Sequence, residues 1–167
     1  MGVTVLAGLT SAWFLEAFTG AEASGGTASI LRYLPLIIGL SGNIGIQSST
    51  IFVRGFATGE IAREREWSVL TSEVAVGTSI GALCGATTLV VASLLERGTW
   101  LDPFGVAVGI AVTVAALWTA ILGCLIPMGC RRAGIDPAIV AGPFLVALSD
   151  VSGSVIYIVV ALRLIGL

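Results

Sequence analysis

Residues 35–55, PLIIGLSGNIGIQSSTIFVRG, give the clearest indication of the fold class. This stretch is long and apolar enough for a membrane-spanning helix, because about 20 residues cross the ~30 Å hydrocarbon core. Yet its centre carries amide and hydroxyl groups, among them Asn43, Gln47 and Thr50. Those three side chains follow one another at intervals of four and three residues, so they would share one helix face. The pattern predicts a membrane helix with a polar stripe.

Four further apolar runs flank this one, and together the runs take up most of the 167 residues. The chain is 56% hydrophobic and 11% charged, with a mean hydropathy of +1.05, whereas soluble domains have about 25% charged residues. The runs do not alternate, which favours helices over a membrane barrel. We therefore predict an all-α membrane protein, residues 1–167 forming a single transmembrane domain in the cell (inner) membrane. Its five transmembrane helices are expected at about residues 2–19, 33–53, 68–95, 103–130 and 137–162.

The arginines, which are all eight of the basic residues, set the predicted orientation. A cytoplasmic N-terminus places five of them inside the cell and three outside, in line with the positive-inside rule. Five spans then place the C-terminus outside. Residues 1–19 lack a basic start and contain Glu16, so we expect a span there rather than a signal peptide. The linker ATGEIAREREW, residues 57–67, is interpreted as a solvated cytoplasmic loop.

Glycines recur at helical spacing in the third and fourth predicted spans, at Gly77, Gly81 and Gly85 and at Gly105 and Gly109. Small residues four apart let two helix backbones approach closely in a membrane. We expect these glycines to serve helix packing.

Several kinds of site are excluded by residue type. The chain has no His, which excludes a His triad and argues against a zinc site. Its three cysteines, an odd number in or beside apolar runs, argue against a disulfide framework. Asp102, Asp136 and Asp150 lie at different depths, whereas acid–base catalysis needs groups within hydrogen-bond reach. We expect neither an enzyme nor a nucleic-acid-binding protein.

The last predicted span carries one charge, Asp150, near its centre. It would lie roughly 15–20 Å from either end, too deep to reach the surface, and a charged Asp there costs at least ~3 kcal/mol. Intramembrane carboxylates usually mark ion or proton pathways. We therefore predict Asp150 as a metal-binding residue and Asn43, Gln47, Ser149 and Ser154 as pore-lining residues. The alternative, in which the polar side chains only join helices, stays open.

Glu73 is a second candidate. It lies one or two turns beyond Trp67, an aromatic residue typical of the membrane interface. We expect its side chain to reach the lipid head groups, with an accessory role in the pore as the alternative.

The donors on the two polar spans are hard oxygen atoms, which favour Mg²⁺, Ca²⁺ or Mn²⁺ over metals that prefer imidazole or thiolate. One carboxylate per chain is few for a divalent cation, but a two-fold dimer with the last span at its axis would supply two. Because Mg²⁺ releases its water reluctantly, two carboxylates facing a hydrated ion would suffice.

The two polar spans also share a pattern. PLIIGLSGNIG (35–45) and PFLVALSDVSG (143–153) match in Pro, Ser and Gly at the same offsets. An inverted repeat around a midplane site would produce this match, and chance would also. In either case Pro35 and Pro143 each remove a backbone donor, which frees carbonyl oxygens for a cation.

Three stretches resemble the membrane domain of the MgtE family of magnesium channels or transporters. Residues 35–55 look like the family's Gly-Asn-x-Gly-x-Gln-Ser segment ending in Arg-Gly. LIPMGCRRAG, residues 125–134, looks like the Arg-Arg end of its fourth span, and GIDPAIVAGPFLVALSDVSGSVIY, residues 134–157, looks like its fifth span.

The resemblance implies a homodimer with its pore between subunits, lined by spans two and five. Asp150 matches the family's pore aspartate, which faces hydrated Mg²⁺, and Asn43 matches a pore-lining asparagine. The backbone around Val146 would add carbonyl contacts. Gly142 stands where some members have a polar side chain and is a possible accessory residue. The family's N-terminal cytoplasmic domains, including a CBS pair that closes the pore, are not among these residues, so we expect no such gating by this chain alone.

The leading hypothesis is therefore a magnesium channel that conducts hydrated Mg²⁺ down its electrochemical gradient, with Mn²⁺, Co²⁺ or Ca²⁺ as other candidate ions. A proton- or sodium-coupled cation exchanger is the first alternative. A non-conducting assembly subunit, in which the polar stripes only join helices, is the second.

Overall fold

The computed structural model describes residues 26–97 and 101–166. The first predicted span, residues 2–19, lies outside the described residues. Within them the chain is helical, in the order α2 (Gly26–Arg32), α3 (Leu34–Thr58), the 3₁₀ turn η1 (Arg63–Arg65), α4 (Glu66–Arg97), α5 (Pro103–Arg132), α6 (Pro137–Val140) and α7 (Pro143–Ile165). Four segments are long and apolar enough to cross a membrane: Leu34–Thr58, Arg63–Leu95, Pro103–Arg132 and Pro143–Ile165. The chain is thus a multi-pass membrane protein.

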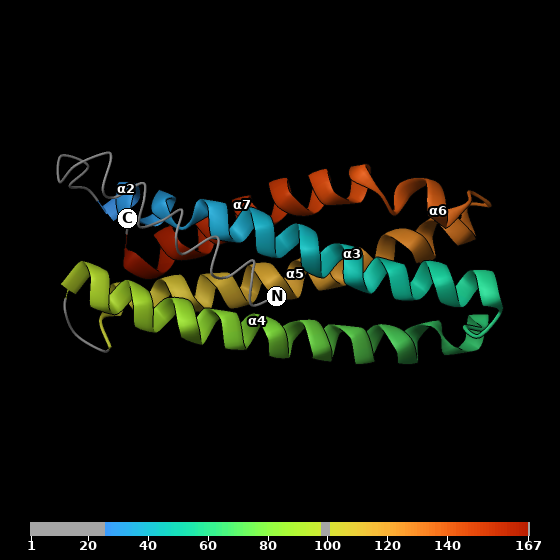
Figure 1. The fold of residues 1–167 in the computed structure, drawn as a ribbon, viewed down its shortest axis with the longest axis horizontal. Helices are drawn as coiled ribbons and strands as arrows, with labels where there is room; N and C mark the ends of the chain where they lie inside the picture. Colours follow the sequence, from blue (N-terminus) through green and yellow to red (C-terminus); the bar gives the residue numbers. More distant parts are fainter. Residues whose placement is uncertain (1–25, 98–100, 167) are drawn as a thin grey trace.

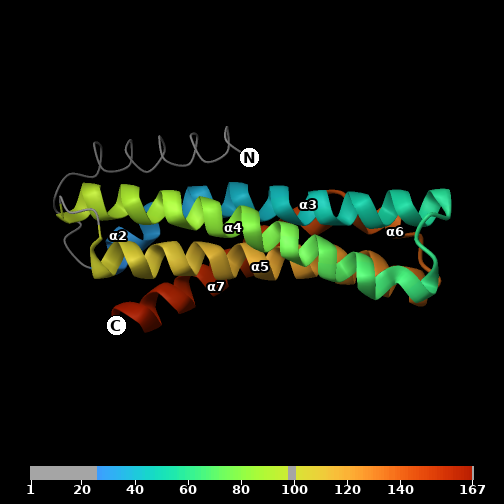
Figure 2. The ribbon, with the colours of Figure 1, turned by 90° about the horizontal axis from the view of Figure 1, so that it is seen from below.

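The four long helices run side by side along the molecule (Figure 1). Helix α5 is central and packs against α3, α4 and α7, while α3 also packs along α7 and hardly touches α4. The turn from α3 to α4 lies at the same end as α6, and α2 lies with the C-terminus at the opposite end (Figures 1 and 2). The core between α3, α5 and α7 is made of apolar side chains, including Ile37, Leu40, Ile44, Val108 and Val112.

The recurring glycines lie between α4 and α5, as their spacing predicts. A Cβ atom at Gly77 or Gly81 would lie 2.5 Å from the Cβ of Ala120 or Ala116 respectively. At Gly85 it would lie 2.5 Å from the carbonyl oxygen of Gly109. Because no side chain fits at such distances, these glycines set the close approach of the two helices.

Helix ends follow local sequence signals. Asp102 caps α5 by accepting from the N–H of Phe104 at 2.9 Å, and Asp136 caps α6 by accepting from the N–H of Ala138 at 2.9 Å. Helix α3 continues five residues beyond the predicted end and stops at Gly59, which adopts the left-handed conformation (φ 75°) common after a helix.

The last predicted span is interrupted. A continuous helix is expected over 137–162, whereas α6 ends at Val140 and α7 begins at Pro143. Proline has no N–H to donate and disfavours helical backbone in the residue before it. Gly142 accordingly adopts φ −101° and ψ −130°. The apolar run from 137 therefore crosses as a short helix, a break and a long helix.

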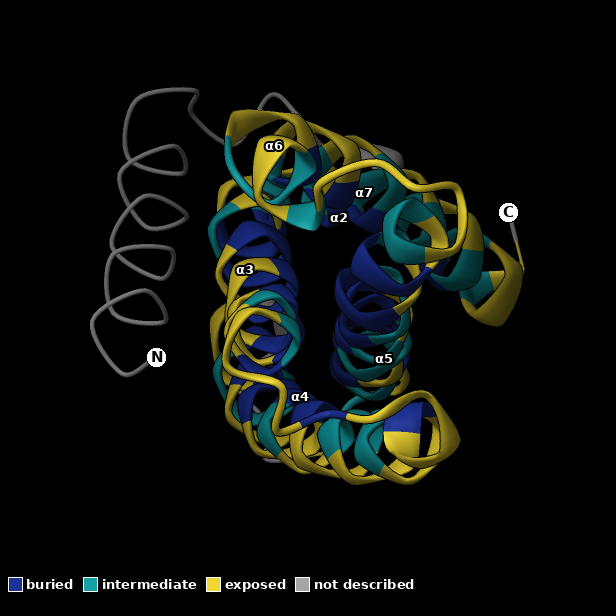
Figure 3. Ribbon diagram, turned by 90° about the vertical axis from the view of Figure 1, so that its right-hand side faces the viewer, coloured by how far each residue is buried: buried dark blue, intermediate teal, exposed yellow. Residues whose placement is uncertain are grey.

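Seen from the end that carries α6, buried residues face the inside of the bundle and exposed ones the outside (Figure 3). Of the residues that the sequence marks as functional, Asn43 and Gln47 are exposed on the outside of α3.

Candidate functional site

The seam between α3 and α7 is built on small residues. A Cβ at Gly42 would lie 2.7 Å from Oδ1 of Asp150 and 3.3 Å from Cγ1 of Val146. At Gly45 it would lie 2.5 Å from Oγ of Ser149. Glycine on α3 therefore makes room for the polar side chains of α7, and Asp150 lies directly against the backbone of α3.

Asp150 is half-buried, and its Oδ1 atom is buried without a hydrogen-bond partner. Among the described residues, the same is true of the hydroxyl oxygens of Ser49, Ser149 and Ser154. Buried polar atoms in folded proteins almost always have a partner, so such a group calls for water, an ion or another chain. These four oxygens lie on α3 and α7, and those of Asp150 and Ser149 lie against glycines of α3, which marks this seam as the candidate site.

Asp150 lies near the middle of the bundle's length. On α7 it is seven residues, about 10 Å, from Pro143 and fifteen residues, about 22 Å, from Ile165. Gly42, its neighbour on α3, is about 12 Å from Leu34 and about 24 Å from the other end of α3. The two helices are antiparallel, so their shorter segments point to opposite ends of the bundle. The segment from Asp150 to Pro143 is preceded by α6, and the segment from Gly42 to Leu34 is preceded by α2. The interruption of the last span places Asp150 closer to the start of its helix than the 15–20 Å expected for an unbroken span.

Asn43 is exposed beside this seam, since the adjacent residue Gly42 contacts Asp150. Its Nδ2 donates to the carbonyl oxygen of Gly39 at 2.7 Å, one turn earlier in α3. Val146 and Ser154 lie one turn before and after Asp150, and both are half-buried. Val146, Asp150 and Ser154 thus follow one another at helical spacing on α7, and Val146 and Asp150 lie against Gly42, the residue before Asn43.

The remaining predicted residues lie elsewhere. Ser149 is fully buried, facing Gly45 on the inner side of the seam. Gly142 lies in the break before α7 and lines a groove of about 320 Å³ with Thr50, Arg54 and Ala138. That groove places α6 beside the last turns of α3.

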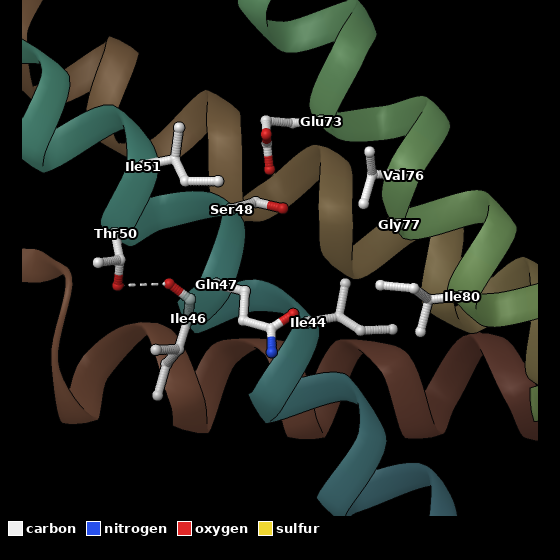
Figure 4. Close-up of a pocket in the computed structure, with 10 residues that line it drawn as sticks. All are labelled: Ile44, Ile46, Gln47, Ser48, Thr50, Ile51, Glu73, Val76, Gly77 and Ile80. Carbon is white, nitrogen blue, oxygen red and sulfur yellow. Dashed lines mark hydrogen bonds between the residues drawn. The ribbon is translucent and has the colours of Figure 1, made fainter. Parts of the chain in front are cut away.

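Gln47 and Glu73 form a separate group on the other flank of α3. They line a pocket of about 360 Å³ between α3 and α4, together with Ser48 and Thr50 (Figure 4). Glu73 is half-buried there and its carboxylate points toward the Ser48 hydroxyl. The sequence predicts that this side chain reaches the head groups, whereas the structure places it in a pocket within the bundle.

Comparison with known proteins identifies the family of this chain. The model of the MgtE family, described as a divalent cation transporter, matches residues 34–160. The chain belongs to the MgtE family.

Three curated relatives are each called a magnesium transporter MgtE. The protein of Thermus thermophilus is 29% identical over 163 residues, which are 95% of this chain and 34% of the relative. That of Enterococcus faecalis is 35% identical over 135 residues, 80% of this chain and 29% of the relative. That of Bacillus subtilis is 29% identical over 129 residues, 77% and 28% respectively. This MgtE-family chain thus spans about a third of the length of these relatives.

The described residues of this MgtE-family chain contain no group of three His, Cys, Asp or Glu side chains that could hold a metal ion. Within residues 26–97 and 101–166, Asp150 is the one carboxylate at the α3–α7 seam, so this part of the chain offers a single negative charge there.

One ionic cluster of the chain is not predicted from the sequence. Glu66, in the supposedly solvated linker, is fully buried, and its two carboxylate oxygens accept from Arg131 and Arg132, each at 3.2 Å. Arg131 also donates to the carbonyl oxygen of Ile61 at 3.0 Å. This cluster joins the start of α4 to the end of α5. The paired arginines at a helix C-terminus are the available signal, since that position favours cations and attracts an acidic partner.

Proposed function

We propose that this chain forms the membrane part of a magnesium channel, which conducts hydrated Mg²⁺ along the outer face of α3 and α7 down its electrochemical gradient. The observation that carries the proposal is the unpartnered carboxylate oxygen of Asp150, at mid-depth beside the exposed Asn43. Family membership supports a divalent cation as the cargo, and the names of the relatives favour Mg²⁺.

A second copy of the chain would complete the site. Two chains facing each other at the α3–α7 seam would bring two Asp150 carboxylates to one path, and together they would balance the charge of one Mg²⁺. Exposed apolar side chains on α7 next to the seam offer the packing surface, at Phe144, Leu148, Val151, Val155 and Val159. We propose a homodimer with the pore at this interface.

Hydrated passage follows from the donor set. Mg²⁺ usually keeps several waters and is bound through one or two carboxylates. Water molecules of its shell could donate to Asp150, to the Asn43 oxygen and to nearby hydroxyls such as Ser154. A membrane potential of 100 mV acts on the two charges with ~4–5 kcal/mol, so the potential alone can drive inward flux.

The test is Mg²⁺ influx into liposomes that contain this chain, under an inside-negative potential and without a pH or sodium gradient. Asp150→Asn keeps the size of the side chain and removes its charge. At roughly 5 Å from a divalent ion, one carboxylate contributes roughly 2–7 kcal/mol between bulk-water and protein-surface screening. Influx should therefore fall at least about tenfold, since each 1.4 kcal/mol is a factor of ten.

Asp102→Asn is the matched control, because it removes a carboxylate at the start of α5 while Asn still caps the helix. It should conduct like the parent. Equal influx in parent and Asp150→Asn would overturn the role of Asp150. If influx needs a proton or sodium gradient, the protein is a coupled exchanger and the channel proposal is wrong. Replacing Mg²⁺ by Mn²⁺, Co²⁺ or Ca²⁺ in the same assay tests selectivity.

A further inference from the structure

The pocket between α3 and α4 opens on the same outer face of α3 that carries Asn43. Gln47 and Thr50 are both exposed on that face, one and two turns beyond Asn43, and both line the pocket (Figure 4). Helix α4 hardly touches α3, and this leaves the space between them. Anything that moves along the outer face of α3 therefore passes the mouth of this pocket.

Glu73 projects into the pocket from α4 and has no cationic partner. It lies seven residues, about 10 Å, beyond the buried Glu66. Glu66 is held by two arginines, whereas no described residue forms an ion pair with Glu73. The Glu73 carboxylate points toward the Ser48 hydroxyl (Figure 4). A half-buried carboxylate without a cation beside it lacks compensation for its charge.

The pocket suits a hydrated cation in size and in chemistry. Six waters at ~30 Å³ each occupy about 180 Å³, and the pocket measures about 360 Å³. Its polar side chains offer a carboxylate, an amide oxygen and two hydroxyls from Glu73, Gln47, Ser48 and Thr50. These are hard oxygen donors of the kind that Mg²⁺ and Mn²⁺ prefer.

We propose that this pocket is a second site for a hydrated divalent cation, with Glu73 as its charged residue. Ser48 lies six residues beyond Gly42 on α3, so the second site is displaced by about 9 Å along α3 from the level of Asp150. An ion held there would repel one at Asp150 and favour its release, as between neighbouring sites in other channels. That role rests on the proposed function, whereas the binding itself does not.

The experiment counts Mn²⁺ bound to the whole purified chain in detergent, by electron paramagnetic resonance of the free ion. The variants are Glu73→Gln, which keeps shape and loses charge, and Gln47→Ala on the pocket's other wall. Glu60→Gln is the matched control. Glu60 is exposed in the linker after α3, ten residues beyond Thr50, and does not line the pocket. Asp150→Asn tests Mn²⁺ binding at the α3–α7 seam, independently of the pocket.

The parent and Glu60→Gln should show two sites that Mg²⁺ competes for. Glu73→Gln should weaken one of them at least tenfold, Gln47→Ala should weaken the same one by a few-fold, and Asp150→Asn should spare it. Influx in Glu73→Gln should fall several-fold without vanishing.

Unchanged Mn²⁺ binding in monodisperse Glu73→Gln would overturn the second site. If Asp150→Asn alone loses Mn²⁺ binding, the second site is overturned too and the proposed function stays intact. A monodisperse Asp150→Asn that keeps both sites and full influx would sink the proposed function alone.

Discussion

The cluster that joins α4 to α5 makes a sharp prediction for Glu66→Ala. In the parent, Oε1 and Oε2 of Glu66 accept from Arg131 and Arg132 at 3.2 Å, and the carboxylate is fully buried. The guanidinium of Arg131 also lies over the ring of Phe56, 4.4 Å from its centroid. Removing the carboxylate leaves two arginines without their anion and a cavity at the start of α4.

The size of the expected stability loss in Glu66→Ala follows from the burial of Glu66 and of its two arginine partners. Deleting one partner of a fully buried ion pair costs about 3–5 kcal/mol. Here the arginine side chains are 35% and 47% exposed, so water solvates the freed cations in part and lowers that cost. Arg131 also keeps its bond to Ile61. We therefore expect a loss of about 2–3 kcal/mol, which for a chain of this size lowers the unfolding midpoint by about 4–12 °C.

Thermal unfolding in detergent, followed by the monodisperse fraction on size-exclusion chromatography, measures the loss. Glu64→Ala is the matched control, since Glu64 is exposed in η1 and carries the same charge. Glu66→Gln, which retains hydrogen-bond acceptance without charge, should fall between the two. If Glu66→Ala unfolds within about 1 °C of Glu64→Ala, the cluster contributes nothing and the reasoning from burial fails.

Two further substitutions test the seam and the end of the bundle. Gly42→Ala places a methyl group 2.7 Å from Oδ1 of Asp150, so the carboxylate must turn aside; Mg²⁺ influx should fall severalfold while the unfolding midpoint drops by less than about 4 °C. Gly129→Ala, whose methyl group would meet no atom within 4 Å, should match the parent, and equal influx in both variants would contradict the assignment of the seam. Tyr157→Phe removes the bond from the buried hydroxyl to the carbonyl oxygen of Ile30 at 2.9 Å, which joins α7 to α2. The expected loss is about 1 kcal/mol, or a midpoint lower by about 2–4 °C, and an unchanged midpoint would show that the bond is dispensable.

The parts of the fold that depend on neighbouring residues could be predicted from the sequence. Run lengths and polarity locate the four described spans, and four-residue glycine spacing predicts close helix packing, which the structure places between α4 and α5. Pro143 also signals the break before α7, because proline ends a helix at the residue before it. The prediction of one unbroken span over 137–162 gave the apolar run more weight than this local rule.

The parts that depend on how helices dock could not be predicted. Glu66 and its partners Arg131 and Arg132 are more than 60 residues apart, and no local pattern pairs them. Asn43 and Gln47 share a helix face, yet four residues turn a helix by about 400°, so Gln47 is rotated by ~40° from Asn43. That rotation brings Gln47 to the pocket of Glu73 and leaves Asn43 beside Asp150.

The carboxylates of Glu66, Asp150 and Glu73 have different surroundings, and these surroundings separate their roles. Glu66 is fully buried and has two cationic partners, so its charge is balanced within the chain. Asp150 and Glu73 are half-buried and form no ion pair with any described residue. A charge at such depth costs at least ~3 kcal/mol, and folding alone gives no reason to keep it. Both carboxylates lie beside the outer face of α3, which agrees with our proposal that a divalent cation from outside the chain balances their charge.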